Sequence, residues 1–430
     1  MYKNVARIEV FIWDHKVGAI ALDPKNGYYV FAYYPQFSKL GIELAPLQMP
    51  VTTFSPYVFA FLPELTFKRL PALLADSLPD DFGNNLIDAW MAKQGVLKDN
   101  ITALDRLAYM GKRGMGALEF KPDRTHAKHS VTAIKLSNLV ETARKAIHAD
   151  ISDDHLAEAA LNQLIKVGTS AGGARAKATL AWNPETDEIR AGQFKVDPGF
   201  EHWLLKFDGL GPDLALGSSM DYGRIEYAYY MMATHAGIRM SPCRLMQEGN
   251  RAHFMTKRFD RDGNKKIHIQ TLCAMSHLDY KQLAAHDYSQ LFQTIDQLGL
   301  DYSSKEEAFR RMVFNVLAAN CDDHTKNISF LLKEWGTWEL APAYDVTHAF
   351  NPTGEWTHQH LMSVNGKFKN ISREDVMNVA DRFAIGTSGK VIKQVAEAIG
   401  GWPEIAREAG IDSSEIRRIS DDHEKMKFGI

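Results

Sequence analysis

The sequence predicts an α+β protein with a small mixed domain at the N-terminus, a strand-rich lobe and a mostly helical lobe. Three observations lead to this fold class. Residues 5–34 show the alternation and aromatic content of strands. Residues 178–259 contain further apolar strands that follow a glycine-rich segment, and residues 305–427 mostly repeat apolar side chains at helical spacing.

The N-terminal domain is expected at residues 1–125. Its strands should pair through a turn at Asn26-Gly27, a dipeptide that favours tight hairpins. Helices are predicted at residues 84–94 and 102–110, the second ended by Gly111. The polar stretch at 126–130 is typical of a linker.

The rest of the chain, residues 150–430, is predicted to form the two lobes. Elements of the smaller lobe extend to about residue 260, and the helical lobe occupies about 265–430. Its predicted helices are residues 276–300 for the most part, 305–319, 373–383, 388–399 and 404–427. Two short strands are expected at 328–332 and 337–340.

Composition limits the possible functions. The chain has 430 residues and a net charge of −3, so a large basic surface for tight DNA binding by this chain alone is not expected. Its three cysteines lack the spacing of a metal or redox site and are consistent with a reducing cytoplasm. No stretch approaches the length of a membrane span, and none is expected.

The segment Asn320-Cys-Asp-Asp-His-Thr-Lys-Asn327 carries the clearest chemical pattern. Asp322 and Asn327 have the D-x-x-x-x-N spacing of a kinase catalytic loop, in which the Asp accepts a hydroxyl proton and the Asn binds Mg²⁺. Asp345 follows across one predicted hairpin and could supply a second metal ligand. The pattern therefore predicts a bilobal, protein-kinase-like fold that transfers a phosphoryl group from ATP with Mg²⁺.

A glycine-rich segment at residues 166–177 precedes the strands of the smaller lobe. Gly168 and Gly173 have Walker A spacing, but Ala174 stands where the lysine should be. Lys206 follows within an apolar strand, which is the order in which kinase small lobes present their phosphate-binding groups. The strand at 251–259 is expected where a hinge would contact the base.

Each of these residues also has a purely structural interpretation. Asp322 and Asn327 could cap a turn after the helix, and Lys206 could be a lysine whose amine reaches solvent. Glu226 is an ion-pair candidate for Lys206 or a solvated helix residue. Cys321 is expected to be a small core residue, and His324 could orient the loop or contact the substrate.

Six segments in the same order resemble the HipA family, the serine/threonine kinase toxins of bacterial type II toxin–antitoxin pairs. They are Ser170-Ala-Gly-Gly-Ala-Arg-Ala-Lys177, Leu205-Lys206-Phe207, Lys257-Arg-Phe-Asp-Arg261, Asp322-Asp-His-Thr-Lys-Asn327, Pro342-Ala-Tyr-Asp345 and Ser363-Val-Asn-Gly366. Residues 74–80 and 113–119 resemble the family's N-terminal domain. The resemblance covers nearly the whole chain.

The resemblance implies a role for each matching residue. Asp322 would be the catalytic base, Asn327 and Asp345 the Mg²⁺ ligands, and Lys206 a phosphate contact. Ser170 would be the serine whose autophosphorylation inactivates the kinase, since a phosphate there adds about two negative charges beside the ATP site. The remaining ATP contacts would be Gly172, Gly173, Ala174, Arg175, Ala176, Lys177, Lys257, Arg258, Phe259, His324, Thr325, Lys326 and Tyr344.

Two departures from the family pattern stand out. Lys257 replaces an acidic residue of the best-known member, which is harmless if the contact there is made by the backbone. Asp323 replaces a glycine beside Asp322. This extra carboxylate could raise the pKa of Asp322, add a metal ligand or alter specificity for the protein substrate.

The resemblance also implies partners. The substrate class would be aminoacyl-tRNA synthetases, and a helix-turn-helix antitoxin of HipB type would restrain the kinase and make most of the contact with operator DNA. Two other functions compete with this one. A small-molecule kinase for antibiotics or sugars would use a similar loop but would not label itself at Ser170, and a non-enzymatic binding module would be expected to have lost its ligands.

Overall fold

The computed structural model describes residues 2–51, 55–79, 81–124, 176–192, 195–208 and 221–428. The chain forms two compact units, and each unit is built from three separate segments of the sequence. The first unit comprises Met1–Gly211, Lys257–Gln270 and Leu331–Thr337, and the second comprises Pro212–Thr256, Thr271–Phe330 and Trp338–Ile430. Ser170 and residues 172–175, for which nucleotide roles are predicted, lie outside the described residues.

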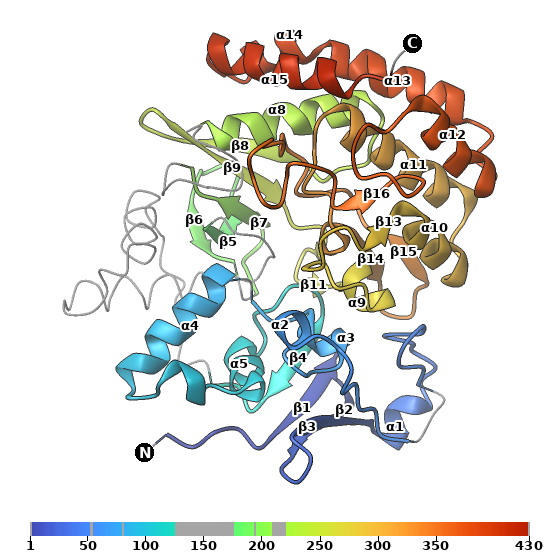
Figure 1. Cartoon of the computed structure of the whole chain (residues 1–430). Helices are drawn as coiled ribbons and strands as arrows, with labels where there is room; N and C mark the ends of the chain where they lie inside the picture. The colour runs from blue at the N-terminus through green and yellow to red at the C-terminus, as the bar shows by residue number, and fades with distance from the viewer. Residues whose placement is uncertain are drawn as a thin grey trace. The chain divides into compact units, whose positions relative to one another are not determined.

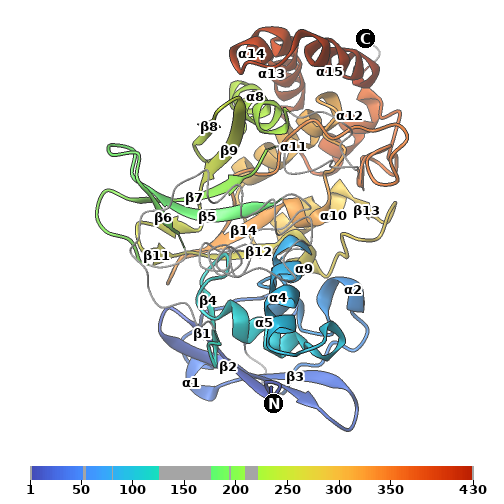
Figure 2. The same ribbon diagram turned by 90° about the vertical axis from the view of Figure 1, so that its left-hand side faces the viewer.

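The first unit begins with a four-stranded antiparallel sheet of order β3-β2-β1-β4 (Figures 1 and 2). Its strands are β1 (Arg7–Ile12), β2 (His15–Asp23), β3 (Tyr28–Tyr33) and β4 (Leu118–Lys121). Trp13 and Asp14, both with positive φ (46° and 63°), make the tight turn between β1 and β2. The predicted turn at Gly27 is confirmed, with φ of 72°.

Short helices cover the rest of this domain. They are α1 (Pro35–Ser38), α2 (Glu64–Phe67), α3 (Ala72–Ala75), α4 (Asp81–Lys93), the 3-10 turn Lys98–Asn100 and α5 (Ala103–Met110). A capping box between Thr102 and Asp105 starts α5. The buried Asp105 carboxylate also accepts from the backbone N–H of Val5 at 2.8 Å, so the helix cap holds the segment that leads into β1.

A second sheet of the first unit contains β5 (Lys177–Trp182), β6 (Ile189–Ala191) and β7 (Glu201–Lys206). β5 pairs antiparallel with both β6 and β7. Every residue of β5 is buried, including its two polar residues Lys177 and Thr179. The strands predicted around residues 178–183 and 201–208 are therefore present.

Residues 257–270 return to the first unit and bind its N-terminal domain through a buried charge cluster. The short strands here are β10 (Arg261–Asp262), β11 (Lys265–Lys266) and β12 (His268–Thr271). Asp260, fully buried, accepts hydrogen bonds from Arg258 (2.7 and 2.9 Å), Arg261 (2.6 Å) and the backbone N–H of Gly116 (2.7 Å). Gly116 needs its positive φ of 74° to approach this closely.

The second unit is mostly helical. Its helices are α8 (Tyr222–His235), α9 (Leu272–Ser276), α10 (Tyr288–Gln297), α11 (Tyr302–Leu317), α12 (Arg373–Arg382), α13 (Ser388–Gly400), α14 (Trp402–Glu408) and α15 (Ser413–Met426). Its strands are β8 (Cys243–Glu248), β9 (Arg251–Lys257), β13 (His286–Asp287), β14 (Ser329–Leu332), β15 (Trp338–Leu340) and β16 (Met362–Ser363). No helix among the described residues is both long and apolar enough to cross a membrane.

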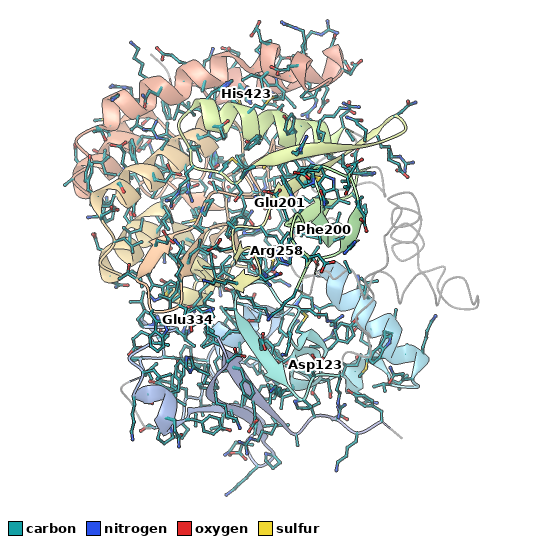
Figure 3. All side chains as sticks on the ribbon, turned by 180° about the vertical axis from the view of Figure 1, so that it is seen from behind. Asp123, Phe200, Glu201, Arg258, Glu334 and His423 are labelled. Carbon is teal, nitrogen blue, oxygen red and sulfur yellow. The ribbon has the colours of Figure 1, made fainter. Side chains whose placement is uncertain are left out.

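The core of the second unit is centred on Tyr229 of α8. Its ring contacts Phe314 of α11 and Trp402 of α14, and its hydroxyl donates to the carbonyl of Ala318 at 2.6 Å. The same hydroxyl lies 2.8 Å from His423 of α15, the residue labelled near the top of Figure 3. α8 and the C-terminal helices thus bury one side of α11, the helix that leads into the predicted catalytic loop.

Two helix predictions were wrong in extent. The single helix predicted at 404–427 is two, because Gly410 has φ of 77° and Asp412 then caps α15. Only α10 and the end of α9 are helical within 276–300. His277 and Ala284 have positive φ, which a continuous helix does not allow, and Asp287 begins α10 with a capping box of its own. The segment between α9 and α10 is therefore a loop, although its apolar residues had suggested a helix.

Replacing Asp260 with Asn should reduce the free energy of unfolding by about 3–5 kcal/mol, because it leaves two buried guanidinium groups without a counter-charge. Burial alone would raise the pKa of Asp260, but Arg258, Arg261 and the hydrogen bonds hold it below its usual range. This contribution should therefore be complete above the unfolded aspartate pKa of about 3.9 and be lost as pH falls through the lower folded value.

Denaturant unfolding at several pH values measures this effect. Asp262→Asn is the matched control, since Asp262 is an exposed neighbour on β10, and it should change stability by no more than about 0.5 kcal/mol. Equal stability of the two variants at neutral pH would contradict the assigned role of the cluster.

Candidate catalytic and metal-binding site

The predicted catalytic loop lies directly after α11. Asp301 caps the start of this helix by accepting from the backbone N–H of Ser304. The helix ends at Leu317, and Ala319 with φ of 52° turns the chain out of it. An extended stretch then leads to the 3-10 turn Thr325–Asn327 and into β14. The loop is therefore anchored between a buried helix and a buried strand.

Asn327 closes this loop onto Asp322. Its side-chain N–H donates to the backbone carbonyl of Asp322 at 2.9 Å. Because the amide nitrogen is used in this way, the amide oxygen is the atom that Asn327 can offer to a cation. The Asp322 side chain itself is 42% exposed, as a group that must reach a substrate requires.

Asp345 lies after β15 and has an unusual backbone. Its φ of 52° places it in the left-handed region, which aspartate tolerates better than most residues and which costs about 1–3 kcal/mol. The preceding Tyr344 holds this turn against the catalytic loop, since its hydroxyl donates to the carbonyl of Lys326 at 2.8 Å and contacts the Ser329 hydroxyl. The backbone N–H of Ala343 donates to the backbone carbonyl of Arg239 at 2.8 Å.

Asp322, Asn327 and Asp345 line one cavity of about 30 Å³ within the second unit. That is room for an ion and a water molecule. Arg311 also lines it and donates to the carbonyl of Ala341 at 2.9 Å. Burial lowers the pKa of Arg311 although its ion pair with Glu307 opposes the shift.

The donor set fits Mg²⁺, which prefers oxygen ligands and usually takes only one or two protein carboxylates plus phosphate oxygens. Among the described residues, no group of three or more His, Cys, Asp or Glu side chains is arranged to hold a metal by itself. A carboxylate and an amide oxygen at one cavity are therefore an incomplete shell that a bound triphosphate would complete.

Comparison with known proteins agrees with this architecture. A family model described as the HipA-like C-terminal domain matches residues 169–424, and one described as the HipA N-terminal domain matches residues 8–121. The first alone spans more than half of the chain. The chain belongs to the HipA family.

One solved structure shows the same fold. HipA of Shewanella oneidensis MR-1, whose structure is a toxin–antitoxin complex with HipB and operator DNA, matches with a TM-score of 0.67 at 17% identity. The match covers 97% of this chain and 95% of that one. The Helicobacter pylori proinflammatory kinase CtkA matches 59% of this chain and 90% of its own at 14% identity, and its TM-score of 0.36 is too low to indicate a common fold.

The remaining HipA-like loop residues use their side chains in different ways. Thr325 is fully buried and donates to the carbonyl of Leu278 at 2.7 Å, so only its backbone could meet a nucleotide. His324 lies 3.7 Å from the Asp322 carboxylate and packs against Tyr280 at 5.1 Å between ring centres. The Lys326 ammonium lies 5.3 Å from the centre of the same ring.

The predicted phosphate contact Lys206 lies in the first unit, where it is buried in β7 as its apolar neighbours indicated. Lys177 stands directly opposite it on β5. Opposed residues of an antiparallel pair project from the same face of the sheet, so two buried lysines lie side by side there. Ala176, just before Lys177, accepts from the backbone N–H of Phe207 at 3.0 Å.

The predicted base-contacting residues 257–259 have structural partners of their own. Lys257 pairs with Glu201 at 2.5 Å, and Arg258 is buried against Asp260. Figure 3 labels Glu201 and Arg258 in this part of the first unit. The backbone N–H of Arg258 donates to the backbone carbonyl of His202 at 2.9 Å. The Arg258 side chain is therefore committed to the fold, and a nucleotide contact by these residues stays a prediction.

Asp323 also lines the cavity, but hydrogen bonds within the protein occupy its carboxylate. It is fully buried, and its two oxygens accept from the Tyr288 hydroxyl (2.8 Å), from His360 (3.0 Å) and from the backbone N–H of Leu361 (2.8 Å). Burial opposes protonation of His360, but Cys321 and Asp323 outweigh it and raise the His360 pKa well above its usual value. Asp323 is an anchor of the loop.

Sequence reasoning missed Tyr288, Asn315, Asn320 and His360, which form the polar environment behind the loop. Only Asn320 stands in the segment singled out above, where it had no assigned role, and the sequence separation of the other three conceals their contacts. The only available signal was the cluster of polar residues on either side of Asp322, which a buried loop would have to satisfy.

Replacing Asp323 with Ala should reduce the free energy of unfolding by about 3–5 kcal/mol, because it leaves a buried imidazolium and two other donors without an acceptor. Replacing the adjacent, half-exposed Asp322 with Ala should cost no more than about 1 kcal/mol. Urea unfolding of both variants measures the difference. Similar losses for the two would show that the buried and exposed roles are not separated as the structure indicates.

Proposed function

We propose that this HipA-family protein is an ATP- and Mg²⁺-dependent serine/threonine protein kinase that acts as the toxin of a type II toxin–antitoxin pair. The observation that carries the proposal is that Asp322, Asn327 and Asp345, separated by up to 23 positions (345 − 322), line a single cavity. A base and two oxygen ligands are the parts that phosphoryl transfer requires of a catalytic loop.

In this mechanism Asp322 orients the hydroxyl of the protein substrate and accepts its proton. Asn327 and Asp345 would hold Mg²⁺, which would neutralise charge on the phosphates. Lys206 would be the phosphate contact, as the family resemblance implies. Gly172 to Ala176 and residues 257–259 would surround the rest of ATP, together with His324 to Lys326 and Tyr344. Because the Asn327 amide and the Tyr344 hydroxyl hold the loop together, little reorganisation is needed during the reaction.

The proposal extends to partners and regulation. Family membership and the Shewanella complex support an antitoxin of HipB type, with operator DNA contacted mainly through that partner. An aminoacyl-tRNA synthetase is the proposed substrate, and phosphorylation of Ser170 is the proposed means of self-inactivation. The cytoplasm is the proposed location, where all three partners would be found.

Incubation with ATP and Mg²⁺ should place a phosphate on Ser170, located by mass spectrometry of peptides. Asp322→Asn keeps the size of the side chain but removes the base, and it should lower this labelling by about 10²–10⁴-fold while nucleotide still binds. Asp381→Asn, at an exposed helix position, is the control and should label normally. Normal labelling by Asp322→Asn would refute the assigned base.

A small-molecule kinase would turn over an antibiotic or sugar without labelling Ser170. No turnover with any acceptor, together with no nucleotide binding, would support the non-enzymatic alternative.

Removing either proposed metal ligand should weaken the metal site. Asp345→Asn and Asn327→Ala should each raise the dissociation constant for Mn²⁺, measured by electron paramagnetic resonance with a non-hydrolysable ATP analogue, by about tenfold or more. The loss of Asp345 should be the larger because a full charge is removed. Unchanged Mn²⁺ affinity in both variants would place the cation elsewhere.

A further inference from the structure

A continuous chain of buried and partly buried hydrogen bonds connects the two ends of the segment 320–323 and lines the same cavity as Asp322. The side-chain N–H of Asn320 donates to the Asn315 oxygen at 2.8 Å, and the Asn315 N–H donates to the Tyr288 hydroxyl at 2.9 Å. That hydroxyl in turn donates to the Asp323 carboxylate at 2.8 Å. This series of hydrogen bonds begins at Asn320 and ends at Asp323, on either side of Asp322. Between these two loop residues it passes through Asn315 of α11 and Tyr288 of α10.

Each of the three bonds joins one donor to one acceptor, and all three run in one direction toward a carboxylate. Such an arrangement polarises each bond and strengthens the next. The Tyr288 hydroxyl is the central link because it accepts one bond and donates the other. Burial, together with the nearby Asp323 charge, raises its pKa well above the usual value, so it keeps the proton that it donates.

Rigid neighbours support the two middle residues. Tyr288 is fully buried at the first position of α10, which is held by the capping box of Asp287 with Gln290. Asp287 also accepts from the Ser363 hydroxyl and from the backbone N–H of Gly366 at 3.0 Å. Asn315 lies in the last turn of α11. Tyr288 and Asn315 are therefore fixed by their helices and would not move with the loop.

The segment before β16 holds Asp323 from the other side. His360 and the backbone N–H of Leu361 donate to its two oxygens. His360 also faces Cys321, whose sulfur lies 3.9 Å from its second ring nitrogen. Both sequence neighbours of Asp322 are therefore buried. The Asp322 side chain remains accessible, and its backbone carbonyl accepts a hydrogen bond from the Asn327 amide.

We propose that Tyr288 and Asn315 form a bridge that positions Asp322 by holding Asn320 and Asp323, so that Tyr288, Asn315 and Asp323 are positioning residues of the kinase. The catalytic part of this inference rests on the proposed function. The structural part, that the bridge holds residues 320–327 in place, does not.

Tyr288→Phe is the sharpest test, since it removes one oxygen atom and breaks two bonds of the bridge while keeping the ring. It should lower kcat for phosphoryl transfer by about 10- to 100-fold through misplacement of Asp322. KM for ATP and the affinity for a non-hydrolysable ATP analogue should stay within twofold, since no proposed nucleotide ligand is altered. Hydrogen exchange of the backbone amides in 320–327 should become faster.

Tyr229→Phe is the matched control. Tyr229 is equally buried, and its hydroxyl also makes two contacts, with the Ala318 carbonyl and His423, but none with Asn315 or Asp323. A comparable loss of thermal stability is expected, with kcat and exchange in 320–327 within twofold of the wild type.

The bridge is only structural if Tyr288→Phe keeps its kcat, or if both variants lose kcat in proportion to stability. If the wild-type protein transfers no phosphate, the proposed function and the catalytic role of the bridge both fail. Hydrogen exchange then still decides whether the bridge holds the loop, and unchanged exchange in Tyr288→Phe would overturn that as well.

Discussion

The burial of the Asp323 carboxylate is the constraint on which the site in the second unit depends. A buried charge is tolerated only when donors and counter-charge surround it, and here they come from Tyr288, His360 and the backbone of Leu361. Meeting that requirement brings together α10, the end of α11 and the segment before β16. The adjacent Asp322 is then presented to solvent on a backbone that cannot easily shift.

A comparable constraint organises the first unit. Asp260 binds two arginines and the backbone of Gly116, so residues far apart in the chain share one buried ion cluster. The motif Lys257-Arg-Phe-Asp-Arg261 therefore has a structural function whether or not its backbone meets a nucleotide. In both units, an aspartate that looks like part of a functional motif turns out to be an internal anchor.

Much of the fold could be predicted because its signals are local. The N-terminal strands, α11 and α13 follow from apolar spacing, and the turn at Gly27 from its dipeptide. The errors were also local in origin. The apolar pattern across Gly410 and Ala284 did not reveal that the backbone adopts positive φ there. For the site, the spacing of Asp322, Asn327 and Asp345 predicted which residues meet. It could not show that the side chains of Thr325 and Arg258 form hydrogen bonds within the protein, to Leu278 and Asp260.

The sequence by itself determined the family, the mixed α/β class and the three residues Asp322, Asn327 and Asp345 that meet at one cavity, since these depend on motif order and residue chemistry. Only the tertiary structure decided what each charged side chain does. Asp322 and Asp323 are adjacent and chemically identical, yet one is exposed and the other is enclosed by donors from residues 35 and 38 positions away. Burial and hydrogen bonding are set by contacts between distant segments, and no local pattern records them.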